Sequence, residues 1–395
     1  MRKESESISS YGRQRITEAD INAVVEVLRS PFLTQGPKVE TFEKAIACKV
    51  EAKYAVAVNS GTSALHIACI ALGLSPGEWL WTSPISFVAS ANCAVYCGAK
   101  VDFVDINKET GLLNIDALKN KLKIAEKVGK LPKVLIPVHL AGCSCEMKEI
   151  SLLAKKYGFK ILEDASHALG GFYQGHPVGS CKYSSITIFS FHPVKMITTG
   201  EGGMATTNDE NLSKIMKLLR SHGITKDARE FEGLALNPWT YQQKILGYNY
   251  RISDIQCSLG YSQSKRLEEI VNFRNILRDK YCDLMKNLPA KLLDIPKGVK
   301  SSVHLAIIRL NNKSEDYHRC VFDSLRSYGI GVQVHYSPIH LQPFYRNMGF
   351  KEGDFPIAEN YSKNAISLPL HLDLKTKDIE LIVSQLSIAI ENCST

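Results

Sequence analysis

Three polar groups in the sequence are of types that can do chemistry, and each directly follows an apolar run. Lys195 lies between the apolar run 186–190 and a glycine-rich turn. Partial burial near a cationic ring lowers the pKa of a lysine toward the neutral amine that forms a Schiff base. Asp164 ends the run 160–164, and the turn 59–63 (NSGTS) follows the run 54–58 and opens a helix. This turn predicts a phosphate site made of backbone N–H groups and hydroxyls.

Each of these groups also has a simpler explanation when it is taken alone. Serine and threonine commonly cap helices, and Asp164 would fit such a cap as well as it fits a ligand-binding role. A single lysine has no diagnostic value, and an isolated His167 would more often be structural or would hydrogen-bond Asp164. Ser190, five residues before Lys195, adds a further hydroxyl to the predicted phosphate site.

An alternation of strands and helices must position these groups. Apolar runs predict strands over residues 54–58, 79–83, 101–105, 134–139, 160–163, 186–190 and 203–207. Amphipathic segments predict helices over residues 17–30, 39–50, 63–72, 87–97, 115–121, 147–157 and 210–221. Such alternation indicates an α/β fold with a mostly parallel sheet covered on both faces. Ligands of such sheets bind outside the carboxyl ends of the strands, where the polar groups lie.

The pattern changes near residue 250. It predicts a long helix over 254–288, either continuous or broken, a strand over 303–310, a helix over 317–328 and a strand over 332–336. A chain of 395 residues also exceeds one ordinary domain. We therefore predict a large domain, residues 1–250, and a smaller C-terminal α+β domain, residues 251–395.

Composition argues against several classes of protein. The net charge of +8 is spread over 48 basic and 40 acidic residues without a basic run of five, so no nucleic-acid partner is predicted. No stretch reaches the ~18 apolar residues that span a bilayer, and the N-terminus lacks the apolar region of a secretory signal. The 11 cysteines include no Cys-x-x-Cys pair, which predicts free, buried thiols in a reducing cytosol and no metal site.

Several motifs taken together resemble one family. They are SGTSALHIA, TSPISFVASANC, EDASHALGG, SFHPVKMITTGEGG, LRSHGI, GYNYRISDIQCSLG, VQVHYSPIHLQPFY and SLPLH. In this order they are similar to the DegT-type sugar aminotransferases, which share the type I fold of enzymes that depend on pyridoxal 5'-phosphate (PLP). The resemblance runs from about Tyr11 to His371, nearly the whole chain.

The resemblance implies a role for each matching residue. Lys195 forms the Schiff base with PLP, Asp164 binds the pyridine nitrogen, and His167 lies by the ring, where many relatives have glutamine. The other cofactor contacts that it implies are Phe87 over the ring face, the phosphate ligands Thr62, Ser63 and Ser190, and Asn249 donated by the neighbouring subunit of a homodimer. It implies sugar-nucleotide contacts for Tyr11, Arg251, His335 and Tyr336. Met196 departs from the family, which has proline after the lysine.

The resemblance is nearest to members that aminate a UDP-linked 4-keto-6-deoxy-N-acetylhexosamine in pseudaminic acid biosynthesis, with L-glutamate as the amino donor. Three alternatives stay open. The first is another nucleotide-linked 4-keto or 3-keto sugar, of the bacillosamine or legionaminic acid type. The second is a sugar dehydratase on the same fold, which Lys195 argues against because the lysine is replaced there. The third is a PLP-binding regulator without turnover, which would carry a DNA-binding extension.

Overall fold

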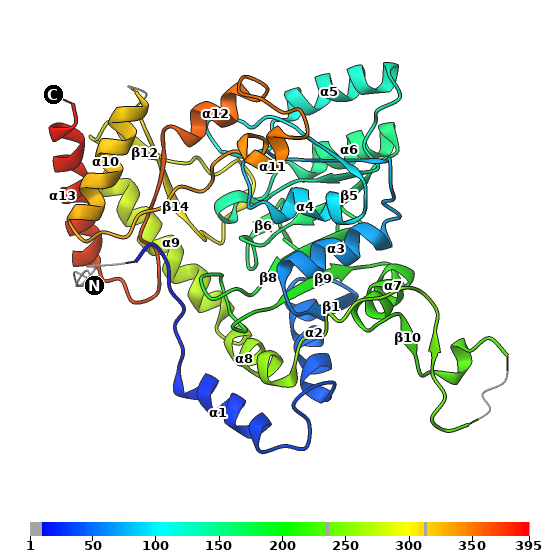
Figure 1. The fold of residues 1–395 in the computed structure, drawn as a ribbon. Coiled ribbons are helices and arrows are strands. Elements are labelled where there is room, and N and C mark those ends of the chain that lie inside the picture. Colours follow the sequence, from blue (N-terminus) through cyan, green and yellow to red (C-terminus); the bar gives the residue numbers. More distant parts are fainter. Residues whose placement is uncertain (1–9, 234–236, 312–313, 395) are drawn as a thin grey trace.

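The computed structural model describes residues 10–233, 237–311 and 314–394. A seven-stranded sheet in the order β1-β9-β8-β5-β4-β2-β3 forms its centre (Figure 1). β9 is antiparallel to β1 and β8, and the other neighbouring pairs are parallel. The strands are β1 (Tyr54–Val58), β2 (Trp79–Thr82), β3 (Lys100–Phe103), β4 (Val134–Ile136), β5 (Lys160–Asp164), β8 (Ile186–Ser190) and β9 (Gly203–Thr207). The predicted α/β class with a mostly parallel sheet is confirmed.

The strands of this sheet are buried because helices pack against it. α3 lies against β1, β8 and β9, α6 packs on β5, and α2 packs on β1. The helices of this part are α1 (Glu18–Leu28), α2 (Pro37–Lys49), α3 (Gly61–Ala71), α4 (Ala89–Tyr96), α5 (Ile115–Lys127), α6 (Met147–Tyr157), α7 (Glu210–Arg220) and α8 (Asp254–Ser264). Every residue of β4 and of β9 is buried, which is the pattern of strands covered on both faces.

The C-terminal part has a smaller antiparallel sheet in the order β12-β14-β15. Its apolar cluster consists of residues between Leu277 and Ile390, which supports a second domain. Ile339, Tyr345 and Phe355 nevertheless pack into the cluster of the large sheet, so the division at residue 250 stays a prediction. The elements are α9 (Leu267–Leu284), β12 (Ala290–Leu292), β13 (Val299–Lys300), β14 (Ala306–Leu310), α10 (Glu315–Ser327), α11 (Pro343–Arg346), α12 (Pro356–Ser362), β15 (Ala365–Leu368) and α13 (Thr376–Asn392).

One predicted strand is absent from the structure, and of the two possibilities for the long helix the structure has the broken one. Residues 332–336 are not a strand, because only Gln333 pairs there, with Ser367. Val332 is buried in the apolar cluster of the small sheet without strand pairing. The predicted helix 254–288 is two helices, α8 and α9, which are separated at Lys265 and Arg266.

The expectation of free thiols is wrong for two cysteines. Cys320 and Cys393 form a disulfide, with their Cα atoms 5.9 Å apart. They are 73 residues apart in sequence and meet because α10 packs beside α13. The separation in sequence gave no signal of this pairing. Six of the nine free cysteines are buried, as expected for small apolar side chains.

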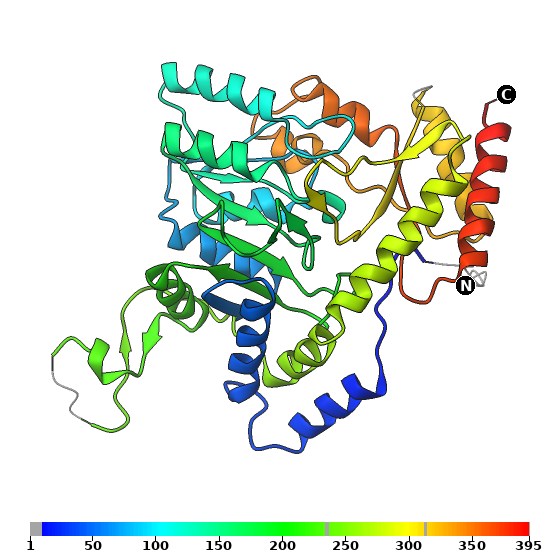
Figure 2. The same cartoon turned by 180° about the vertical axis from the view of Figure 1, so that it is seen from behind.

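A narrow arm extends from the large sheet. It comprises β10 (Ile224–Thr225), the 3-10 helix Ala228–Glu230 and β11 (Gln242–Gln243), and it projects away from the rest of the chain in both views (Figures 1 and 2). The remaining short elements are β6 (Phe172–Tyr173), β7 (His176–Pro177) and the 3-10 helices Leu140–Gly142 and Ile339–Leu341. Across the three described ranges, no helix combines the length and apolarity needed to cross a membrane.

Candidate active site

A cavity of about 680 Å³ lies at the carboxyl ends of β1, β5 and β8. This is the edge where ligands of such sheets bind. The structure brings to it every predicted site residue except Asn249 and Arg251, namely Tyr11, Thr62, Ser63, Phe87, Asp164, His167, Ser190, Lys195, His335 and Tyr336. Residues separated by more than 300 positions in sequence thus converge on one space.

The predicted phosphate site is formed where α3 meets the end of β8. A Cβ atom on Gly61 would lie 3.0 Å from the Cβ of Ser190, so glycine permits this close approach. Ser60 caps α3 by accepting the N–H of Ser63, and the first N–H groups of a helix have no partner within it. The N–H groups of Gly61 and Thr62 therefore form the anion-binding end of α3. The hydroxyl of Ser63 donates to Asn59 at 2.7 Å, so Ser63 shapes the turn.

Asp164 is a buried carboxylate at the end of β5. The hydroxyl of Ser90 donates to its Oδ2 at 2.7 Å, and the backbone N–H of Ser166 donates to its Oδ1 at 3.1 Å. The hydroxyl oxygens of Ser90 and Ser86 are 2.7 Å apart, and Ser86 lines the cavity. A carboxylate oxygen has more than one acceptor site, so Asp164 retains capacity for a further N–H group from a ligand. The hydrogen bond from the N–H of Ser166, taken alone, would also occur in an ordinary turn and does not indicate a ligand site.

Lys195 is the principal cation of the cavity. Burial lowers its pKa to about 8, and Asp164 opposes part of this change. An appreciable fraction of the side chain is therefore the neutral amine near pH 8, which is the form required for attack on a carbonyl carbon. The segment that carries it is fixed by the neighbouring Thr198, whose hydroxyl donates to the carbonyl of Phe191 at 2.9 Å.

His167 is held as a neutral ring. The backbone N–H of Ala141 donates to its Nδ1 at 3.3 Å, so the proton is on Nε2, which lies 3.2 Å from the hydroxyl of Tyr336. Burial and then the charge of Lys195 hold the pKa of His167 well below its ordinary value. The sequence left open whether this histidine binds Asp164, and the structure directs its two nitrogens to Ala141 and Tyr336 instead.

The remaining residues of the cavity come from the N-terminal segment, the turn before α4 and the segment 335–336. The ring of Tyr11 lies 5.2 Å from that of His335, whose Nδ1 is 2.8 Å from the hydroxyl of Ser367. Burial lowers the pKa of His335 to about 4, so this ring is neutral too. The side chain of Phe87 is 60% exposed although it lines the cavity, so its face is free for a flat ligand.

Asn249 and Arg251 lie elsewhere. Tyr248 and Tyr250 turn inward and their rings contact the ring of His66, whereas Asn249 between them is exposed. This alternation is the ordinary consequence of an extended backbone, in which successive side chains point to opposite sides. Arg251 lines a separate hollow of about 370 Å³ together with Arg220.

Sequence reasoning missed several residues of the cavity region, three of which add a hydroxyl, a carboxylate and an imidazole. Ser90 binds Asp164, Glu201 adds a second carboxylate to the lining, and the buried His304 has its ring 4.5 Å from that of His167. Burial holds the pKa of His304 well below its ordinary value, and the positive charge of Lys195 adds to this effect. Only Glu201 had a signal, because it stands in the glycine-rich turn after Lys195.

The motifs that pointed to one family can now be compared with known proteins. Residues 14–387 match the DegT/DnrJ/EryC1/StrS aminotransferase family. The chain belongs to this family. It is therefore an aminotransferase that depends on PLP and has the type I fold. Membership of this family also supports the conclusion that it acts on sugars.

Three relatives illustrate the match. The chain is 39% identical over 374 residues to the UDP-4-amino-4,6-dideoxy-N-acetyl-β-L-altrosamine transaminase of Campylobacter jejuni, covering 94% of this chain and 95% of that protein. The solved structure of Helicobacter pylori PseC, an aminotransferase of pseudaminic acid biosynthesis, is 32% identical with a TM-score of 0.88, covering 97% of this chain and 99% of the other. A candidate sugar aminotransferase from Streptococcus pneumoniae, solved in its PMP form, is 31% identical with a TM-score of 0.89, covering 97% and 99%.

Proposed function

We propose that this chain transfers an amino group from L-glutamate to C4 of a UDP-linked 4-keto-6-deoxy-N-acetylhexosamine, in pseudaminic acid biosynthesis. The proposed product is UDP-4-amino-4,6-dideoxy-N-acetyl-β-L-altrosamine, from UDP-2-acetamido-2,6-dideoxy-β-L-arabino-hex-4-ulose. The chemistry is carried by the convergence of Lys195, Asp164 and the N-terminus of α3 on one cavity. The choice of sugar is supported by the names of the Campylobacter and Helicobacter relatives.

The cavity has the groups that PLP requires. The N-terminus of α3, Thr62 and Ser190 would hold its phosphate, because backbone N–H groups and hydroxyls bind anions there. The carboxylate of Asp164 would hold the protonated ring nitrogen, and the exposed face of Phe87 would cover the ring. When bound, PLP supplies an electron sink that stabilises negative charge on a neighbouring carbon.

Lys195 moves the protons in this proposal. Its Nζ atom, whose pKa is lowered to about 8, takes a proton from the α-carbon of L-glutamate and in the second half-reaction gives one to C4 of the sugar. The neutral rings of His167 and His335 add no positive charge that would compete with Lys195 for Asp164. A partly buried lysine close to the carboxylate of Asp164 thus suits both directions of proton transfer.

The nucleotide sugar would bind at the outer side of the cavity. Tyr11, His335 and Tyr336 are the candidates within this chain, because they line the cavity and their rings form one group. Contacts remote from C4 supply binding energy that orients the keto group. We propose that a second copy of the chain completes each site by donating Asn249, and that the homodimer is cytoplasmic, where UDP-sugars and L-glutamate are available.

The proposal is tested with purified protein, PLP, L-glutamate and the two epimeric UDP-linked 4-keto-6-deoxy-N-acetylhexosamines, followed by NMR of the product. Amination of the L-arabino substrate with a clearly higher kcat/KM supports it. Preference for the other epimer would assign the chain to the bacillosamine or legionaminic acid type. A protein that binds PLP but does not convert it with L-glutamate would indicate a regulator.

A further inference from the structure

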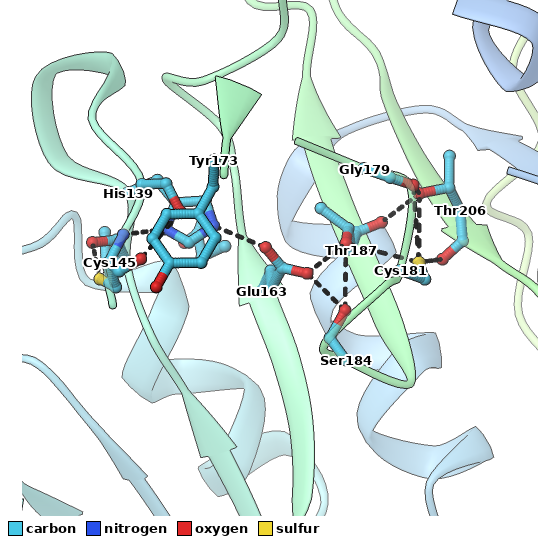
Figure 3. A network of polar contacts seen from close by, with 12 residues as sticks. His139, Cys145, Glu163, Tyr173, Gly179, Cys181, Ser184, Thr187 and Thr206 are labelled. Carbon is cyan, nitrogen blue, oxygen red and sulfur yellow. Dashed lines mark hydrogen bonds and ion pairs between the residues drawn. The ribbon is translucent and has the colours of Figure 1, made fainter. Parts of the chain in front are cut away.

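A buried polar network surrounds Glu163 of β5 (Figure 3). Glu163 and Asp164 are adjacent in the strand, so their side chains point to opposite faces of the sheet. Glu163 is only 5% exposed, and the nearby His139 is fully buried. The proposed reaction uses neither side chain, which leaves a buried carboxylate and a buried imidazole without a chemical role.

The carboxylate of Glu163 accepts three hydrogen bonds from side chains. It accepts from Nε2 of His139 at 2.7 Å, from the hydroxyl of Thr187 at 3.0 Å and from the hydroxyl of Ser184 (Figure 3). Burial would raise the pKa of Glu163, but these hydrogen bonds outweigh it and hold the pKa below its ordinary value. Glu163 is therefore a buried carboxylate whose position is fixed by three donors.

His139 is fixed at both ring nitrogens. The backbone N–H of Cys145 donates to Nδ1 at 3.2 Å, so the proton is on Nε2 and is donated to Glu163. The backbone N–H of His139 donates to the carbonyl of Asp164 at 3.0 Å. One residue thus holds the last two residues of β5, one through its side chain and the other through its backbone.

The segment 137–145, which contains His139, contacts the site at two further points. The carbonyl of Pro137 accepts the N–H of Asp164 at 3.0 Å, beyond the end of β4 at Ile136. The N–H of Ala141 donates to His167, as described above. Ala141 adopts a left-handed conformation with φ of 57°, which is uncommon for a residue other than glycine. Packing and hydrogen bonds must therefore hold this turn in place.

We propose that His139 and Glu163 are positioning residues that hold the carboxylate of Asp164 and the ring of His167 in register for the cofactor. The side chain of His139 pins the segment 137–145 to β5, and this segment in turn sets the backbone of Asp164 and the tautomer of His167. The inference rests on the proposed roles of Asp164 and His167. A misplacement of about 1 Å in such a site can cost about 100-fold in function.

The test is a double-mutant cycle. The quantity measured for each variant is the Kd of PLP for the apo chain, obtained by fluorescence titration. We expect Glu163→Ala to weaken PLP binding by about 10- to 100-fold. We expect Glu163→Gln to restore most of this affinity, because its amide oxygen still accepts from His139 while Ser184 and Thr187 rotate to accept from its NH₂ group. If Glu163 acts through Asp164, then Glu163→Ala should add little in an Asp164→Asn background.

Thr206→Val is the matched control. Thr206 is fully buried and belongs to the far end of the same network, where its hydroxyl donates to the carbonyl of Gly179 at 2.8 Å (Figure 3). This variant should lower the melting temperature without changing the affinity for PLP. Additive losses in the cycle, or equal losses in Thr206→Val and Glu163→Ala, would overturn the positioning role. Wild-type chain that binds no PLP would instead overturn the proposed function, so the two failures are distinguishable.

Discussion

The cavity and the segment 237–251 differ in how many of their polar and aromatic side chains have partners within the same chain. In the cavity, Asp164, His167 and the N-terminal turn of α3 all have partners that fix them. In the segment, Trp239 is 77% exposed and Tyr241 is 59% exposed. One region is organised by its own chain, whereas the other presents large aromatic side chains to the surroundings.

This difference indicates which residues a single chain can position. Large exposed apolar groups gathered on one segment commonly mark an interface. These aromatics could instead have packed under the small domain of their own chain. They do not, since Tyr248 and Tyr250 pack on His66 of α3, and Trp239 and Tyr241 are exposed. The segment therefore remains available for a second copy, and the predictions below separate a cavity that works alone from one that needs this segment.

Lys195→Ala is expected to have the largest effect. The amine is both the nucleophile that attacks the carbonyl carbon and the group that carries the proton. Its loss should therefore lower turnover by about 10³-fold or more while PLP still binds noncovalently. Steady-state amination and absorbance of the PLP-loaded protein measure the two effects. Lys182→Ala, at an exposed lysine before β8, is the control and should retain activity. Substantial turnover by Lys195→Ala would mean that the cavity is not the site of the reaction.

Asp164→Asn should lower kcat by about 100-fold with the fold intact, because an amide cannot stabilise a protonated ring nitrogen as a carboxylate does. The matched variant is Asp209→Asn, since Asp209 caps α7 by accepting from the N–H groups of Asn211 and Leu212. Asparagine caps helices as well as aspartate, so this variant should be fully active. If Asp164→Asn is equally active, Asp164 is only a turn residue.

Most of the sheet and the cavity could be predicted from the sequence because both depend on local patterns. Buried strands appear as apolar runs, and parallel strands bring polar residues at their ends, such as Asp164 and Ser190, to one edge. The hydrogen bonds and packing contacts that hold these residues in place could not be predicted. The bond from Ser90 to Asp164 joins positions 74 apart, and the pairing of Cys320 with Cys393 depends on how α10 and α13 pack. Neither leaves a periodic signal in sequence.

The pH dependence of PLP uptake by the apo chain tests the electrostatics of the cavity. With a pKa of about 8, Lys195 is mostly protonated below this pH, so the rate of Schiff-base formation should rise about tenfold per pH unit up to pH 8 and then level off. A lysine at its ordinary pKa of 10.5 would give a rate that still rises above pH 9. Stopped-flow absorbance between pH 6 and 10 distinguishes the two profiles. A rise that continues past pH 9 would mean that Lys195 is not desolvated.

The last prediction concerns Asn249 and asks whether the segment completes a neighbouring cavity. Asn249 is exposed and lies outside the cavity of its own chain, although its neighbour Tyr250 accepts the N–H of Asn59 at 2.9 Å through its carbonyl. A two-fold dimer would present each Asn249 to the phosphate site of the other chain. Asn249→Ala alone should weaken PLP binding by about tenfold, since one hydrogen bond to a charged group is lost. Aminotransferase activity is measured at a PLP concentration at which most of the Asn249→Ala chains have no PLP bound.

Mixing then decides between the two arrangements. Lys195→Ala and Asn249→Ala chains with different affinity tags are co-expressed, and the protein that carries both tags is purified. If Asn249 acts on the neighbouring chain, one site of this heterodimer has both lesions and the other has none, so activity should return to at most about half that of the wild-type dimer. If Asn249 acts within its own chain, each site keeps one lesion and no activity returns. Single-tag dimers of each variant are the controls, and a monomeric protein in solution would equally refute a shared site, because no second chain could then supply Asn249.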